Sequence, residues 1–440
     1  MIRPELLALQ PGTRARRDIA TCPSSHFVTN PGLSAISARA TIRDIPIFIH
    51  FYPSPMNTPL TPLLAALTLI TGIITSTAGY AAQDQNTVKQ RVDASVMPVM
   101  KKHGIPGMAV GVIAQGNTYL FNYGVASRQT ASTVTSSTLF ELGSISKTFT
   151  ATLASYAQAT GHLKLTDTVA THLPQMQKTA FGSVSLMQLG THTPGGFPLQ
   201  VPEQIRNNEQ LMSYLHQWKP PFEKGTQRTY SNPGIGMLGL ITAKAMGQDF
   251  IPLMEKQIYA GLGLTNTYID IPEHKVADYA QGYTKQDTPA RVSKAVLWAE
   301  AYGAKSTSAD MVRFLKSNMH MTNLDEHLQA AVTNTHTGYF QTAAMTQDLI
   351  WEQYPYPVTL ESLLHGNAAD FALKPQPVKA LVPPVAPRDD VWINKTGSTN
   401  GFGAYVAFVP ARKLGIVILA NKNYPVADRL AIAYRILSEF

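Results

Sequence analysis

The stretch FELGSISKTFTATL, residues 140–153, places a serine and a lysine at the expected start of a buried helix. Gly143 comes directly before Ser144, and an apolar-periodic run follows Lys147. Residues three apart lie on the same face of a helix, so the hydroxyl and the amine are expected to meet there. The helix N-terminus adds positive potential at Ser144. Because a serine is a poor nucleophile until a base takes its proton, a neutral lysine beside it indicates nucleophilic catalysis.

A second motif, TYSNPG, carries a tyrosine and an asparagine two residues apart. On a loop, this spacing brings the phenol of Tyr230 and the amide of Asn232 to the same side. By itself the pair also fits an ordinary turn. Likewise, Ser-x-x-Lys alone also fits a helix start whose lysine is solvated.

A third motif, NKTGSTNGFGAYV, contains Lys395, Thr396 and Gly397. We expect these residues to open a strand that Tyr405 and Val406 continue. The alternative for this motif is a plain turn before a strand. The three motifs in this order are much more specific than any one of them.

Together the three motifs resemble the active-site set of the penicillin-recognising serine enzymes. The second motif reads Tyr-Ser-Asn, where class A β-lactamases have Ser-Asp-Asn, and the closer resemblance is to class C β-lactamases, the cephalosporinases. The resemblance spans residues 85–440 and includes the following stretches: FELGSISKTFT, QLGTHTPGGFPLQVP, GTQRTYSNPGIGMLG, AYGAKST, KTGSTNGFGAYVAFVP and IVILANKNYP.

The resemblance implies a role for each candidate residue. Ser144 attacks the lactam carbonyl, Lys147 accepts or relays its proton, and Tyr230 activates water for deacylation. Lys395, if it lies close to Lys147, would lower a lysine pKa and favour an ionised Tyr230. The substrate is then held by the Ser144 and Ser398 backbone N–H groups as oxyanion hole, by Gln200 and Asn232 at its side-chain amide, and by Lys395, Thr396, Gly397, Ser398 and Arg429 at its carboxylate end. No cofactor and no metal are implied.

Two stretches depart from the family pattern. Residues 293–300 read SKAVLWAE, where the family has a sequence close to Ser-Pro-Gly-x-Leu-Asp-Ala-Glu, so that Lys294 and Ala295 replace Pro-Gly and Trp298 replaces an acid. In NKNYPVADR, Val426 stands where family members often have an asparagine. We expect the first departure to alter the handling of bulky cephalosporins and the second to weaken contacts to the substrate carboxylate. The alternative for Val426 is that it packs against the C-terminal helix and does not meet the substrate.

Hydrophobic periodicity predicts sheet-forming segments at both ends of the chain. Residues 85–104 are expected to form an amphipathic helix, followed by a hairpin through PGMAVGVI and TYLFNYGVA. GAYVAFVP and LGIVILAN predict a second hairpin, and ADRLAIAYRILSEF a last helix. The predicted fold is α+β (α/β), β-lactamase/D,D-peptidase-like. In it an antiparallel sheet flanked by helices (about 82–145 and 320–440) holds a mostly helical insert, 146–319.

The N-terminal part predicts export. Residues 56–81 resemble a signal peptide, with an apolar core and small residues before Gln83. Residues 1–55 lack any helical or strand period and are expected to be a disordered extension upstream of the true start. The single cysteine, Cys22, excludes a disulfide within the chain and a thiolate zinc cluster. The expected product is a periplasmic monomer with no stable membrane partner after cleavage.

Composition limits the partners. The 440 residues carry a formal charge of +8, with no Lys/Arg run interleaved with aromatics, so nucleic-acid binding is not expected. A mild positive charge fits a small anionic substrate such as a β-lactam. The alternatives are a D,D-peptidase, a serine esterase of the same family and, with less support, a non-catalytic cell-wall-binding module.

Overall fold

The computed structural model describes residues 85–440. The predicted extension, 1–55, and the predicted signal peptide, 56–81, lie outside these residues. In the described part, no helix has the length and hydrophobicity that crossing a membrane requires.

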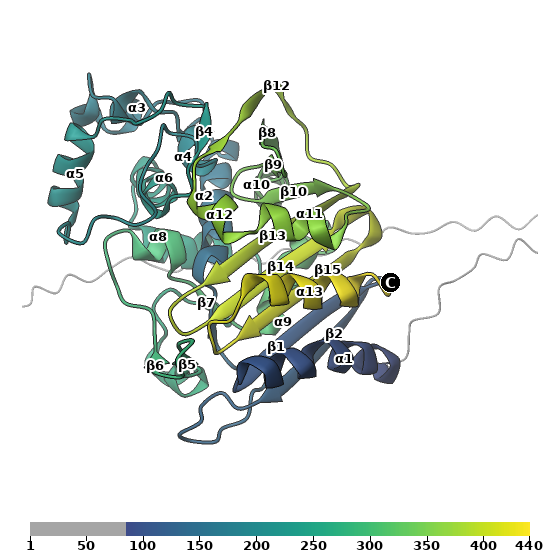
Figure 1. Ribbon diagram of the computed structural model, residues 1–440. Helices are drawn as coiled ribbons and strands as arrows, with labels where there is room; N and C mark the ends of the chain where they lie inside the picture. The colour runs from purple at the N-terminus through teal and green to yellow at the C-terminus, as the bar shows by residue number, and fades with distance from the viewer. Residues whose placement is uncertain (1–84) are drawn as a thin grey trace, which may run out of the picture. The chain divides into compact units, whose positions relative to one another are not determined.

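A nine-stranded antiparallel sheet forms the centre of the described part, in the order β12-β8-β9-β10-β13-β14-β15-β1-β2 (Figure 1). β1 pairs with β15 from Met108↔Ala420 to Ile113↔Gly415, so that the N-terminal hairpin lies beside the C-terminal one, as predicted. The strands of this sheet are β1 (Gly107–Ala114), β2 (Asn117–Gly124), β8 (Gly338–Gln341), β9 (Thr346–Gln347), β10 (Glu352–Pro355), β12 (Lys379–Val385), β13 (Val391–Ser398), β14 (Gly403–Val409) and β15 (Leu414–Ala420).

Helices cover both faces of the sheet. Every residue of β1, β14 and β15 is buried, because side chains on both faces of these central strands meet helices. Val110 and Val112 pack with α1 (Gln85–His103) and α13 (Val426–Leu437), whereas Ala109 and Ile113 pack with α2 (Ser146–Ala159) and α9 (Ser308–Asn318). Figure 1 shows α1 and α13 in front of the sheet and α9 behind it.

The predicted insert is mostly helical and has its own apolar core. Three short two-stranded pieces, which the periodicity did not predict, also belong to it in whole or in part. Their strands are β3 (Phe140–Glu141) with β7 (Lys305–Ser306), β4 (Gln227–Arg228) with β11 (Gln376–Pro377), and β5 (Gly282–Tyr283) with β6 (Pro289–Ala290). The remaining helices are α3 (Val169–His172), α4 (Leu186–Gly190), α5 (Asn208–Gln217), α6 (Asn232–Ala245), α7 (Phe250–Leu253), α8 (Trp298–Tyr302), α10 (Glu326–Asn334), α11 (Leu360–Gly366) and α12 (Ala369–Leu373).

The third motif lies differently from the sequence prediction. Lys395 and Thr396 belong to the last part of β13, and Tyr405 and Val406 lie on the next strand, β14, opposite them. The pairs are Lys395↔Val406 and Thr396↔Tyr405. The chain reverses between the two strands through residues 399–402, where Asn-Gly supplies turn residues, so one continuous strand was the wrong reading.

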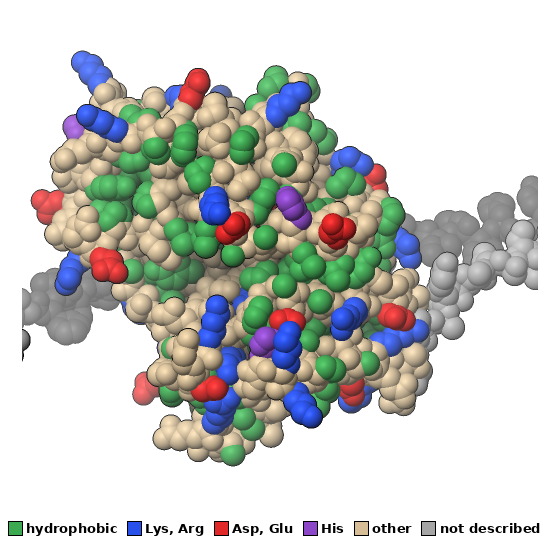
Figure 2. Space-filling view, in the orientation of Figure 1, with side chains coloured by type: hydrophobic (Ala, Val, Ile, Leu, Met, Phe, Trp, Pro, Cys, Tyr) green, Lys and Arg blue, Asp and Glu red, His purple; other side chains and the backbone are tan. Residues whose placement is uncertain are grey.

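Basic and acidic side chains are interspersed on the face of the molecule that Figure 2 shows. This distribution matches the mixed charge pattern of the sequence.

Candidate active site

Ser144 and Lys147 meet as the sequence predicted. Ser144 lies in the short 3-10 helix η1 (Gly143–Ile145), which leads directly into α2. The Lys147 Nζ donates hydrogen bonds to the Ser144 Oγ at 2.9 Å and to the Ala301 carbonyl oxygen at 2.8 Å. Lys147 is completely buried, so its amine has no solvent to compete with these two partners.

The burial of Lys147 makes its amine a usable base. Desolvation lowers the pKa of Lys147 to about 8, and the charge of Lys395 pushes it in the same direction, against the opposing effect of Tyr230. A lysine with a pKa near 8 is deprotonated in a substantial fraction of molecules at neutral pH. The neutral amine can then accept the Ser144 proton.

Tyr230 lies between two lysines. The Nζ atoms of Lys147 and Lys395 are 5.3 and 5.1 Å from the centroid of its ring. Burial alone would raise the pKa of Tyr230, but the charges of the two lysines and the nearby Ser144 hydroxyl lower it to about 8. The phenol therefore has a pKa close to that of Lys147, and it is surrounded by groups that stabilise its ionised form.

Two glycines allow the backbone at Ser144 to touch the backbone at Ser398. Gly143 has a φ of +53°, and a Cβ there would lie 2.5 Å from the Ser398 nitrogen. A Cβ on Gly397 would lie 2.0 Å from the Leu142 carbonyl oxygen. Only glycine permits this close approach of η1 to the end of β13. The predicted oxyanion-hole donors are thereby brought to neighbouring positions.

Gln200 and Asn232 also meet. The Asn232 Nδ2 donates to the Gln200 Oε1 at 2.9 Å, and the Asn232 backbone N–H donates to the Leu199 carbonyl oxygen. Asn232 begins α6, while Gln200 is exposed. The Asn232 Oδ1 is buried and has no hydrogen-bond partner within residues 85–440, so this oxygen is free to accept from another group.

The residues predicted to bind the substrate carboxylate differ in their exposure. Thr396 is half-buried and Ser398 is exposed, whereas Arg429 is completely buried. The Arg429 Nη1 donates to the Gly397 carbonyl oxygen at 2.7 Å and to the Ser398 Oγ at 2.9 Å. Arg429 therefore reaches this end of the site through Ser398, from the α13 side of the sheet. Val426 is half-buried and packs against the core on that same side.

Several residues near Tyr230 escaped the sequence analysis. The Arg228 Nε donates to the Gln347 Oε1 at 2.6 Å, and its Nη2 pairs with the Glu352 Oε1 at 3.0 Å. The Arg228 Cζ lies 5.5 Å from the centroid of the Tyr230 ring. The His192 ring packs on the Tyr230 ring itself, with the two ring centroids 4.4 Å apart. Arg228 stands two residues before Tyr230, but no periodicity or motif links it to Glu352, 124 residues later.

In the segment that differs from the family pattern, residues 293–300, Trp298 lies close to two lysines. The Nζ atoms of Lys294 and Lys305 lie 5.1 and 4.7 Å from the Trp298 ring centroid. Lys294 also pairs with Asp270, at 2.5 Å. Burial lowers the pKa of Lys305 to about 8. The tryptophan that replaces an acid here is thus stabilised by cation–π contacts from both lysines.

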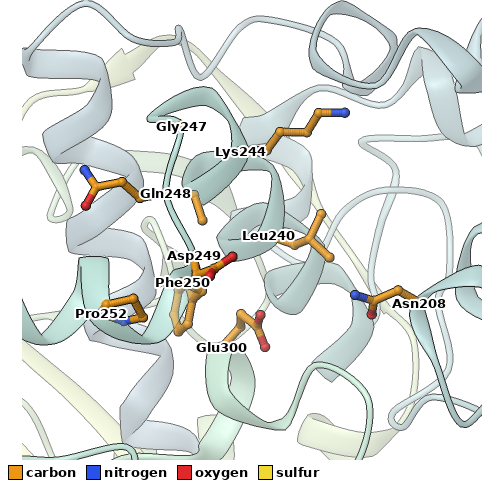
Figure 3. Close-up of a pocket in the computed structure, with 10 residues that line it drawn as sticks. Asn208, Leu240, Lys244, Gly247, Gln248, Asp249, Phe250, Pro252 and Glu300 are labelled. Carbon is orange, nitrogen blue, oxygen red and sulfur yellow. The ribbon is translucent and has the colours of Figure 1, made fainter. Parts of the chain in front are cut away.

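A cavity of about 710 Å³ lies apart from the predicted site residues (Figure 3). Asp249 and Glu300 contribute carboxylates to its lining, and burial raises the pKa of Glu300 to about 7. Neither Ser144 nor any other predicted site residue lines this cavity. Among residues 85–440, no group of three or more His, Cys, Asp or Glu side chains is placed to hold a metal ion.

Comparisons with known proteins show the family of the chain. The family model described as Beta-lactamase matches residues 87–439. A β-lactamase of Pseudomonas fluorescens is 49% identical over 351 residues, which cover 80% of this chain and 98% of that protein. A β-lactamase of Psychrobacter immobilis is 44% identical over 384 residues and covers 87% and 96%.

Solved structures of β-lactamases and related enzymes are also similar to this chain. A class C β-lactamase in complex with cefoxitin is 49% identical, with a TM-score of 0.79, and covers 81% of this chain and 100% of that one. The D-alanine carboxypeptidase AmpC from Burkholderia cenocepacia is 51% identical, with a TM-score of 0.78 and coverages of 81% and 100%. The fold and the resemblance predicted from the three motifs are confirmed: the chain belongs to the β-lactamase family and is similar to its class C serine enzymes.

Proposed function

We propose that the protein hydrolyses β-lactam antibiotics, with a preference for cephalosporins, through an acyl-enzyme on Ser144. The hydrogen bond of 2.9 Å between Lys147 and Ser144 carries this proposal. The Ser144 Oγ attacks the lactam carbonyl carbon while Lys147 takes the hydroxyl proton. The lactam C–N bond breaks, and the ring nitrogen receives a proton from the Lys147 and Tyr230 pair. The developing oxyanion is held by the backbone N–H groups of Ser144 and Ser398.

In deacylation, the second half of the reaction, Tyr230 is the general base. The phenolate removes a proton from water, and the resulting hydroxide attacks the ester carbonyl carbon. The ester C–O bond then breaks, and the Ser144 Oγ leaves with a proton returned by the same pair. A pKa of about 8 makes this exchange feasible near neutral pH, because neither protonation state of Tyr230 is strongly disfavoured there.

The remaining site residues position the substrate. We assign the side-chain amide of the β-lactam to Gln200 and Asn232, since Gln200 is exposed and the Asn232 Oδ1 has no hydrogen-bond partner among the described residues. Lys395, Thr396 and Ser398 receive the substrate carboxylate, supported from behind by Arg429. Export to the periplasm and action as a monomer complete the proposal.

A D,D-peptidase is the second candidate. Two solved relatives favour it by their names: the D-alanine carboxypeptidase from Burkholderia cenocepacia and the β-lactamase/D-alanine carboxypeptidase from Pseudomonas syringae, which is 48% identical with a TM-score of 0.79. Such an enzyme uses the same acylation step on a D-alanyl peptide and releases penicillin slowly. The rate of deacylation therefore separates the two candidates.

The test combines steady-state hydrolysis of a chromogenic cephalosporin with mass spectrometry of the protein after exposure to a penicillin. Ser144→Ala is expected to remove the covalent adduct and to lower hydrolysis by several decades. Ser137→Ala, which changes an exposed serine a few residues upstream, is the matched control and should match the wild type. An adduct that persists in Ser144→Ala refutes the assignment of the nucleophile. A stable adduct on the wild type with no turnover favours the D,D-peptidase.

A further inference from the structure

His192 contacts three consecutive residues of the second motif. Its backbone carbonyl accepts a hydrogen bond from the Thr229 N–H at 2.8 Å, and its ring Nδ1 accepts one from the Ser231 N–H at 3.2 Å. Between these two tethers, its ring packs on the ring of Tyr230 at a centroid separation of 4.4 Å and an angle of 41°. Within residues 85–440, His192 alone combines a ring contact to Tyr230 with hydrogen bonds to the residues on either side of it.

The backbone of His192 is held in an uncommon conformation. Its φ is +62°, in the left-handed region that most residues avoid, and the residue is almost completely buried just after α4. Such a conformation is unfavourable for a residue with a Cβ and persists only where its surroundings impose it. Here the conformation directs the imidazole toward Tyr230 while the carbonyl remains available to Thr229.

The hydrogen bonds also define the charge state of His192. Because Nδ1 accepts from the Ser231 N–H, the neutral ring carries its proton on Nε2. The Nε2 is buried and has no partner within the described residues. Burial, together with the charges of Arg228, Lys147 and Lys395, lowers the pKa of His192 well below its usual range. Burial and the neighbouring cations therefore favour the neutral form of the ring.

We propose that His192 is a positioning residue that fixes the phenol of Tyr230 against Ser144 and Lys147. The proposal rests on the role assigned to Tyr230 in the proposed function. A ring that tilts away from His192 would move the phenol relative to the two lysines, which lie 5.3 and 5.1 Å from its ring centroid. A neutral imidazole can do this without adding a third cation beside the tyrosine.

Three variants separate the contacts of His192. His192→Asn keeps an acceptor for the Ser231 N–H and a residue that tolerates positive φ, but it removes the ring. His192→Phe keeps a ring and removes the acceptor. His192→Gly removes both and relaxes the backbone. The matched control is His320→Asn, since His320 also has positive φ (+54°) but is exposed and hydrogen-bonds to Thr333.

The measured quantities are the deacylation rate of the penicilloyl-enzyme, kcat and KM with a chromogenic cephalosporin, and the pH profile of deacylation. All rates are divided by the fraction of sites that a penicillin labels, so that unfolded protein does not count. We expect His192→Asn and His192→Phe to lower deacylation about tenfold and His192→Gly about a hundredfold. Because slower deacylation lowers kcat and KM together, kcat/KM should change less than threefold. His320→Asn should equal the wild type.

The pH profile of deacylation distinguishes a role of His192 in positioning Tyr230 from a purely structural role. The charged and polar groups that face Tyr230 are Lys147, Lys395, Arg228, Glu352 and Ser144, and all of them remain in the variants. A phenol displaced from the two lysines loses their stabilisation, so the rising limb of the profile should move to higher pH by at least half a unit.

Two results overturn the proposal. One is an unchanged deacylation rate per labelled site in all three variants, and the other is a lowered rate whose pH limb stays at the wild-type position. A wild type that forms the adduct but never releases it refutes the proposed hydrolysis instead. In that event the same variants are compared by the rate and pH dependence of adduct formation, where equal rates would still refute the role of His192.

Discussion

Removal of one partner from the buried pair of Arg228 and Glu352 should destabilise the protein far more than removal of both. The two side chains are only 2% and 7% exposed, and their closest atoms are 3.0 Å apart. Arg228→Met leaves the Glu352 carboxylate buried with only distant support from Asn394 at 3.4 Å. An uncompensated buried charge of this kind costs about 3–5 kcal/mol.

The double variant, Arg228→Met with Glu352→Met, replaces the pair by apolar side chains. Because no charge is then left unpaired, we expect a cost below about 1 kcal/mol, and the two single effects should not add. For a folded unit of roughly 350 residues, 1 kcal/mol corresponds to a melting-temperature shift of about 1–1.5 °C. The single variant should therefore melt about 3–7 °C lower, and the double variant within about 2 °C of the wild type.

Thermal unfolding followed by far-UV circular dichroism gives these shifts. The matched control is the pair of Arg388 and Asp390, whose atoms lie closer, at 2.6 Å, but whose side chains are 47% and 65% exposed. Arg388→Met should cost less than about 1 kcal/mol, since solvent screens exposed pairs. If Arg228→Met and Arg388→Met shift the melting temperature equally, burial is not what makes the Arg228 pair sensitive, and the reasoning is refuted.

Four shorter predictions concern catalysis. Gly397→Ala should lower kcat by a hundredfold or more, because its Cβ would collide with the Leu142 carbonyl oxygen and displace the oxyanion-hole strand; near-normal kcat would contradict this. Val426→Asn should leave kcat and KM unchanged and lower the melting temperature slightly, since Val426 packs against the core; a lower KM would place it at the substrate. Trp298→Asp should change KM for bulky oxyimino cephalosporins but not for a small one. Deacylation should fall about tenfold per pH unit below pH 7, because the pKa of Tyr230 is about 8 and the phenolate is the active form; a flat profile would exclude it as base.

Local patterns predicted much of this structure from the sequence. The helix at 85–104, the two terminal hairpins and the last helix follow from hydrophobic periods that each element satisfies by itself. The Ser144 and Lys147 contact follows from helix geometry, since three residues apart is a local relation.

The pairing of strands and side chains that lie far apart in the chain could not be predicted from the sequence. The strands β8, β9 and β10 are short, and the edge strand β12 contains two consecutive prolines, so their place in the sheet depends on their partners and not on a hydrophobic period. The partnership of Arg228 with Glu352 joins two ordinary charged residues that only the fold brings together. Nothing in the sequence indicated that His192 belongs to the site, because the feature that matters, its positive φ, is imposed by the tertiary structure.

The surroundings of Tyr230 and Lys147 explain why the pKa values of these two side chains converge. Three cations, Lys147, Lys395 and Arg228, lie within about 5.5 Å of the phenol ring, whereas Glu352 is the carboxylate that opposes them. Burial lowers the pKa of Lys147, and the charge of Lys395 lowers it further. Burial would raise the pKa of Tyr230, but the charges of Lys147 and Lys395 lower it, so that the two pKa values approach each other. Groups matched near 8 exchange a proton at little cost in free energy, which is what a site that must first accept and then return the serine proton requires.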